Sequence, residues 1–187
     1  MIQIRRFLSL TLVAGLAVSL AACADQGLTG PTAQVSAKKD KGRTPPLLVC
    51  PVHRTQEASA LIGPAGGTLA VGRSVMVVPQ GAVSEPTEFT MTIPKSQYLE
   101  VEISAAGFEH YVFDAPVSIT LDYTRCQGKK FQDSPLSAWY IDSSSKEPLA
   151  EMAGVDERPS RLLTFWTDHL SGYAAAYRAN SRSAVAD

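Results

Sequence analysis

The amino-acid sequence predicts an all-β fold, an antiparallel β-sandwich, and three observations lead to this prediction. Apolar and polar residues alternate along several stretches, as they do on antiparallel strands with one buried face. Clusters of glycine, proline, aspartate and serine separate these stretches at short intervals, which is typical of sandwiches. Beyond the apolar N-terminal segment, no stretch shows the period of an amphipathic helix.

The clearest strand is residues 87–93, where Phe89, Met91 and Ile93 occupy alternate positions and therefore share one face. Residues 117–123 repeat this alternation. Weaker patterns predict further strands at residues 47–50, 57–62, 68–71, 75–78, 136–141, 148–152, 162–167 and 173–177. Turns are expected at residues 63–67, 79–81, 114–116, 127–128 and 142–145.

The sequence gives more detail for two segments, residues 98–103 and 174–176. Residues 98–103 alternate strictly, so Glu100 and Glu102 lie on the polar face of a strand whose other face is apolar. Residues 174–176 are three alanines, which a helix would tolerate. Their neighbours Gly172 and Tyr173 favour a closing strand instead.

The chain divides into four parts. Residues 1–22 are expected to be a secretory signal, because two arginines precede an uncharged apolar run too short for a typical membrane span. Residues 23–46 have no aromatic residue and no apolar periodicity. They predict a disordered tether with an end-to-end distance of about 25 Å. Residues 47–178 form the sandwich, and residues 179–187 a flexible tail.

The end of the signal, LAAC at residues 20–23, resembles the lipobox of bacterial lipoproteins. The resemblance implies that Cys23 carries acyl chains such as palmitate and becomes the mature N-terminus, anchored in a membrane of the cell envelope. Ala24 follows the cysteine where an Asp would favour the inner membrane, so the outer membrane is the expected location. The alternative is an ordinary cleaved signal in which the cysteine stands by chance.

Charge excludes one class of partner. The formal net charge is −1, and Lys and Arg are scattered, so nucleic-acid binding is not expected. The one basic run, Lys38, Lys39, Lys41 and Arg43, lies beside the anchor. It either touches anionic lipid headgroups or simply keeps the tether solvated.

Cysteine use indicates one disulfide. After Cys23 is lipidated, Cys50 and Cys126 remain, and an even pair in an exported protein predicts a bridge that stabilises the fold by about 4 kcal/mol. Two free buried thiols are the alternative. No metal or cofactor is expected, because the cysteines and the three histidines, His53, His110 and His169, lack the spacing of a metal site.

Residues 62–69 (IGPAGGTL) and 75–83 (VMVVPQGAV) resemble the opening of a ZU-five domain. Residues 113–119 and 167–173 resemble its later strand and its terminal His-Phe-Ser-x-Tyr motif, with Leu170 in place of Phe. The resemblance covers about residues 58–178 and implies a sandwich that binds other proteins. The turn residues of the motif are expected to shape the fold and to have no catalytic role; they are Gly66, Gly67, Pro79 and Gly81.

Asp168, His169 and Ser171 are the candidates for catalysis. On an extended segment His169 and Ser171 share a face and Asp168 points away, so no triad is expected and the protein is not an enzyme. His169-Leu170-Ser171 also resembles the motif of domains that cut themselves after the second residue. There Ser171 would be the nucleophile and His169 its base, whereas residues 171–172 are by default a turn.

The sequence therefore predicts a membrane-anchored, non-catalytic binding module, with a protein partner in the envelope. The alternatives are a carbohydrate- or peptidoglycan-binding module and a self-cleaving domain. The carbohydrate site would use the aromatic pairs 139–140 or 165–166, which are otherwise core and sheet-face residues.

Overall fold

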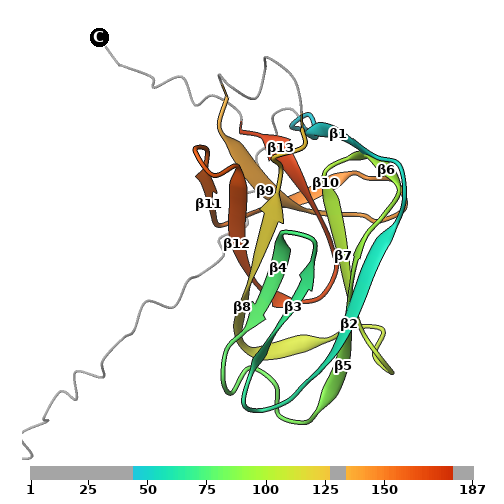
Figure 1. The fold of residues 1–187 in the computed structure, drawn as a ribbon, viewed down its shortest axis with the longest axis vertical. Coiled ribbons are helices and arrows are strands. Elements are labelled where there is room, and N and C mark those ends of the chain that lie inside the picture. Colours follow the sequence, from blue (N-terminus) through green and yellow to red (C-terminus); the bar gives the residue numbers. More distant parts are fainter. Residues whose placement is uncertain (1–43, 127–133, 179–187) are drawn as a thin grey trace, which may run out of the picture. The chain divides into compact units, whose positions relative to one another are not determined.

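Residues 44–126 and 134–178 are described by the structure, a computed structural model (Figure 1). They contain strands and turns but no helix, so the all-β prediction is confirmed. Within these two ranges there is accordingly no helix long and apolar enough to cross a membrane. The predicted signal, Cys23, the basic run and the tail 179–187 lie outside the described residues, as does the turn expected at 127–128.

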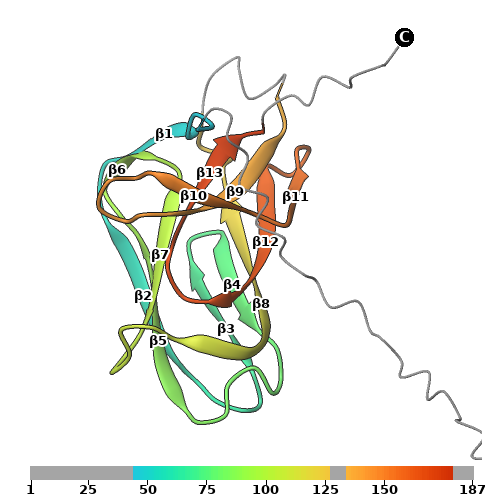
Figure 2. The ribbon, with the colours of Figure 1, turned by 180° about the vertical axis from the view of Figure 1, so that it is seen from behind.

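Two antiparallel sheets make up the fold, and Figures 1 and 2 show them from opposite sides. The six-stranded sheet has the order β10-β9-β13-β7-β5-β2; its strands are β2 (Gln56–Ile62), β5 (Thr87–Ile93), β7 (Glu100–Ala105), β9 (Leu136–Ile141), β10 (Pro148–Met152) and β13 (Gly172–Tyr177). The five-stranded sheet has the order β11-β12-β8-β4-β3; its strands are β3 (Gly67–Val71), β4 (Ser74–Val78), β8 (Val112–Asp122), β11 (Gly154–Glu157) and β12 (Leu162–His169).

The core lies between the two sheets, where the apolar members of each alternating pattern meet. Phe89 and Met91 of β5 are fully buried, as the period of two predicts. Phe165 of β12 packs across the core against Tyr173 of β13, with ring centroids 5.1 Å apart. Phe89 stacks on Phe113 of β8 in the same way, at 5.5 Å. These contacts between the sheets make the fold a sandwich.

A third, two-stranded sheet joins β1 (Val49–Val52) to β6 (Ser96–Tyr98). Just before β1, the backbone N–H of Leu48 donates to the carbonyl of Ala175 (2.8 Å), and the Leu48 carbonyl accepts from Leu99 N–H (3.1 Å). The start of the domain is thus inserted between β13 and the junction of β6 with β7. A single strand was expected at residues 98–103. In the structure Leu99 separates it into the end of β6 and the start of β7.

One predicted turn is wrong. Residues 114–116 do not reverse the chain, because β8 runs without interruption from Val112 to Asp122. Pro116 is tolerated there because it lies outside both ladders of β8. The pairing with β12 is irregular between Val117 and Val112, and the pairing with β4 ends at Ser118. A missing N–H therefore removes no ladder hydrogen bond.

The strand β11 is absent from the expectations. Its sequence, GVDE, has no apolar alternation, and it forms because its four residues pair with Phe165 to Leu162 of β12. Pairing with a neighbour, rather than local pattern, decides this strand.

Candidate functional site

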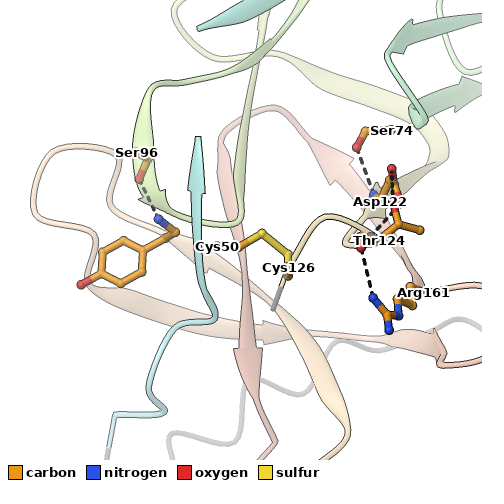
Figure 3. Close-up of a disulfide and its surroundings, with 8 residues drawn as sticks. Cys50, Ser74, Ser96, Asp122, Thr124, Cys126 and Arg161 are labelled. Atoms are coloured by element: carbon orange, nitrogen blue, oxygen red, sulfur yellow. Dashed lines mark hydrogen bonds between the residues drawn. A yellow bond between two sulfur atoms is a disulfide. The ribbon is translucent and has the colours of Figure 1, made fainter. Parts of the chain in front are cut away.

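The predicted disulfide is present and joins Cys50 of β1 to Cys126, which follows β8 (Figure 3). The two Cα atoms are 4.9 Å apart although 76 positions separate the residues in the chain. Both cysteines are buried. Because they are bonded to each other, the alternative of two free buried thiols is wrong. The bridge ties the first strand of the domain to the end of its longest strand, which is a structural rather than a chemical role.

The motif glycines build two turns that touch each other. Gly66 has φ 77°, and a Cβ there would lie 2.5 Å from the carbonyl oxygen of Val78. The second turn, at Pro79 to Gly81, closes on the first because Gly81 N–H donates to the Pro64 carbonyl (2.9 Å). Gly67 does not have a positive φ; it is the first residue of β3. The two blocks of the motif are therefore one structural unit.

The expected geometry at the end of β12 needs a correction. Oδ1 of Asp168 lies 2.9 Å from Nδ1 of His169, so the carboxylate does not point away from the ring. Strand β12 ends at His169, and the extended geometry on which the expectation rested ends with it. Thr167 also turns inward here, and its hydroxyl donates to the His169 carbonyl (3.0 Å).

A base and its orienting carboxylate are therefore adjacent, but a nucleophile is not in place. In the part of the chain that the structure describes, the Ser171 side chain makes no hydrogen bond to His169 or to any other group. Leu170 and Ser171 form the short link by which the chain leaves the five-stranded sheet and enters β13 of the six-stranded sheet. The arrangement orients an imidazole without activating a hydroxyl.

The same link borders a cleft of about 390 Å³. Its lining includes His169, Ser171, Tyr140 of β9 and the segment that carries Phe108 and His110. The cleft brings two of the three histidines together, yet no group of three His, Cys, Asp or Glu side chains within residues 44–126 and 134–178 is placed to hold a metal ion. The Tyr140 ring meets the edge of the His169 ring, with centroids 5.5 Å apart.

The aromatic residues at positions 139–140 and 165–166 differ in their exposure to solvent. Phe165 is fully buried, whereas its neighbour Trp166 points outward and is 47% exposed. Trp139 is half-buried and its indole N–H donates to the hydroxyl of Ser137 (3.0 Å). Trp166 is thus the aromatic residue of these pairs that is most available to a partner.

Trp166 lies on the outer surface of the five-stranded sheet, in a part of that surface that carries no charge. Asp122 and Glu157 in the next row, and Asp168 further along β12, border this part. The strand registers place its residues in two adjacent rows, which we call the uncharged face: Trp166, Ser118, Val77 and Thr68 in one row, and Val155, Thr164, Thr120, Val75 and Ala70 in the other. Val155 and Val77 are 51% and 43% exposed. The hydroxyls of Thr120 and Thr164 are 2.9 Å apart and share a hydrogen bond, so the middle of the face is hydrogen-bonded as well as uncharged.

The outer side of the six-stranded sheet is different. Glu57, Glu88, Glu102 and Glu151 are spread over it, with Lys146 close to Glu102 (3.6 Å). The uncharged face therefore differs chemically from the outer side of the six-stranded sheet. Sequence reasoning missed the uncharged face because its residues come from five separate strands, and only the registers bring them together.

No protein-family model matches the chain, and no curated protein matches it.

Proposed function

We propose that this protein is a lipid-anchored envelope lipoprotein whose β-sandwich is a non-catalytic module for binding another protein. The observation that carries the proposal is the uncharged face, with Trp166 exposed between strands that bear valine, serine and threonine. An exposed surface of this kind, continuous over several strands and without charge, is typical of a docking site. Cys23 would hold the module at the membrane.

The chemistry of the face favours a protein over a glycan. Centres of protein interfaces are depleted in charge and enriched in tryptophan, with apolar contacts around the aromatic anchor. Val77 shares its row with Trp166 and, like Val155, is exposed. An aliphatic side chain complements an apolar protein surface but offers a sugar ring no stacking platform. The partner expected here presents an uncharged, apolar patch.

A glycan remains the second candidate because one specific observation favours it. Trp166 is in register with Ser118 of β8, so the two side chains lie on the same side of the sheet. A sugar ring stacked on the indole would find hydrogen-bonding groups next to it. Self-cleavage is the third candidate, favoured by the contact of Asp168 with His169 and opposed by the position of Ser171.

Site-specific photo-crosslinking in membranes tests the proposal. A benzophenone amino acid replaces Val77 on the uncharged face, and a control chain carries it in place of Ser104, which is exposed on β7 of the other sheet. We expect protein adducts of discrete mass from position 77 only, and their loss when Trp166→Arg is added. Equal adducts at both positions, or none at position 77, would contradict the proposal.

Two further arms separate the alternatives. Binding of the full chain to isolated peptidoglycan sacculi that is lost in Trp166→Ala would support the glycan candidate instead. For the anchor, Cys23→Ala is expected to move the protein from the membrane fraction to the soluble fraction; a chain that stays in the membrane fraction would contradict lipidation.

A further inference from the structure

We propose that two copies of this protein associate through the free edge of β2, so that their six-stranded sheets become one continuous antiparallel sheet. This interface is independent of the uncharged face, which belongs to the other sheet. It rests on the hydrogen-bonding pattern and the side chains of β2, and it would form whether or not the uncharged face binds a protein.

Among the strands within residues 44–126 and 134–178, β2 ends the six-stranded sheet and pairs with β5 alone. Its seven residues match those of β5 in an unbroken register, from Gln56 with Ile93 to Ile62 with Thr87. It contains no proline, no lysine and no bulge, which are the devices that usually protect an edge from pairing.

The other three edges of the two large sheets are shorter. Strand β10 begins with Pro148, has a register shift after it, and carries Glu151 near Arg178. Strand β11 has four residues, two of them acidic, and β3 has five. Among the edges that the structure describes, β2 is the longest and the most regular.

The hydrogen bonds show which backbone groups of β2 are free. Ala106 N–H donates to the Glu88 carbonyl (2.9 Å), so Glu88, Thr90 and Thr92 direct their backbone groups toward β7. The intervening residues of β5 therefore bond to β2, through Gln56, Ala58, Ala60 and Ile62. The N–H and C=O groups of Glu57, Ser59 and Leu61 consequently point away from the sheet.

A two-fold axis through Ser59 satisfies all of these groups at once. Ser59 then faces Ser59 of the second copy, and Glu57 faces Leu61 of the second copy on either side of the axis. Each strand contributes three N–H donors and three C=O acceptors, so the pair forms six hydrogen bonds and leaves none of these groups free. The contact is self-complementary, as a closed dimer requires.

The side chains select this register over its neighbours. Centred on Ser59, the acidic Glu57 lies opposite Leu61, which is 72% exposed in the single chain and would be covered. Centred on Glu57, the two carboxylates would face each other, which is unfavourable. On the inner side, Ala58 would face Ala60 of the second copy, and both are small and only partly buried.

Cysteine crosslinking of the full chain in membranes tests the contact and its register. In a hydrogen-bonded antiparallel pair the two Cα atoms are about 5.5 Å apart, within the range of a disulfide. Ser59→Cys is expected to give a disulfide dimer, whereas the control Ser104→Cys, exposed on β7, stays monomeric. Glu57→Cys alone should not crosslink, but Glu57→Cys combined with Leu61→Cys should.

A second pair of variants tests the contact without a new thiol. Ser59→Pro removes an N–H that none of the described strands uses, so the fold is kept while the edge is blocked. Ser59→Ala keeps that N–H and loses only the hydroxyl contact with Thr90. Light scattering of the purified chain should show a dimer for Ser59→Ala and a monomer for Ser59→Pro.

A monomeric Ser59→Cys chain, equal crosslinking of the Ser104 control, or a dimer that survives Ser59→Pro would overturn the proposal. An adduct from Ser59→Cys with a different protein would also overturn it, since the edge would then receive a foreign strand. Adducts from position 77 are independent of these outcomes, so failure of the dimer and failure of the proposed function are distinguishable.

Discussion

Nζ of Lys146 lies 2.7 Å from Oε2 of Glu100, a carboxylate on β7 that is only 1% exposed. Neither oxygen of Glu100 has a hydrogen bond of good geometry within the described residues, so the ammonium is its main compensation. Lys146 has a positive φ of 61° and closes a turn that starts at Asp142, whose carboxylate accepts from Ser144 and Ser145. This turn covers the outer side of the six-stranded sheet and buries the Glu100 side chain. The alternating pattern predicted only that Glu100 lies on the polar face of its strand.

Lys146→Met is therefore expected to destabilise the fold by about 3 kcal/mol, because it leaves a buried carboxylate without its counter-charge. Adding Glu100→Gln should restore most of the loss. Chemical unfolding of the parent chain, of Lys146→Met and of the double variant measures these free energies. A Lys146→Met chain as stable as the parent would show that the ion pair does not contribute to stability.

Gly66→Ala should cost about 2–4 kcal/mol, since its Cβ would meet the Val78 carbonyl and its φ is 77°. Gly81→Ala is the matched control: φ is 80° there, but a Cβ would have open space, so the cost is about 1 kcal/mol. Thermal unfolding compares them. A Gly81 variant as unstable as the Gly66 variant would assign the effect to φ alone.

Replacing both Cys50 and Cys126 with serine should lower the free energy of unfolding by about 4 kcal/mol, because the bridge closes a long loop. Reductant should destabilise the parent chain in denaturant and leave the double variant unchanged. If the double variant responds to reductant as well, the effect does not come from this disulfide.

Alkaline pH should destabilise the protein. Burial raises the pKa of Tyr123, with help from its hydrogen bond to Asp156 (2.5 Å), and burial likewise raises the pKa of Tyr173. The unfolded chain releases these protons near pH 10 while the folded chain keeps them, so stability is complete below about pH 10 and falls above it. Unfolding curves between pH 8 and about 11 should show a shallower decline for Tyr123→Phe than for the parent.

The purified chain should migrate without a self-cleaved fragment on a denaturing gel, because Ser171 is not hydrogen-bonded to His169. Ser171→Ala should migrate in the same way. Two fragments from the parent and one band from Ser171→Ala would show that the link between β12 and β13 cleaves itself.

Local pattern was sufficient where one face of a strand is buried. Residues 87–93 form β5 with the predicted boundaries because Phe89, Met91 and Ile93 each need the core. The disulfide was predictable from the pair of cysteines that remains once Cys23 is assigned to the expected lipobox. By contrast, β11 has no pattern of its own, and Pro116 indicated a turn where a register shift allows a strand.

The candidate site was less predictable. His169 and Ser171 were recognised in the sequence, but the contact of Asp168 with His169 depends on where β12 ends. The sequence identified Trp166 as a member of an aromatic pair. It did not indicate that Phe165 would be buried while Trp166 faces outward in the uncharged face.

By itself, the sequence determined the all-β class, most strand positions and the disulfide partners, because alternation and cysteine number act locally or by simple count. Only the tertiary structure decided the uncharged face, the free edge of β2 and the burial of Glu100. Each of these depends on which strands become neighbours and in what register, and that is settled by pairing between residues far apart in the chain.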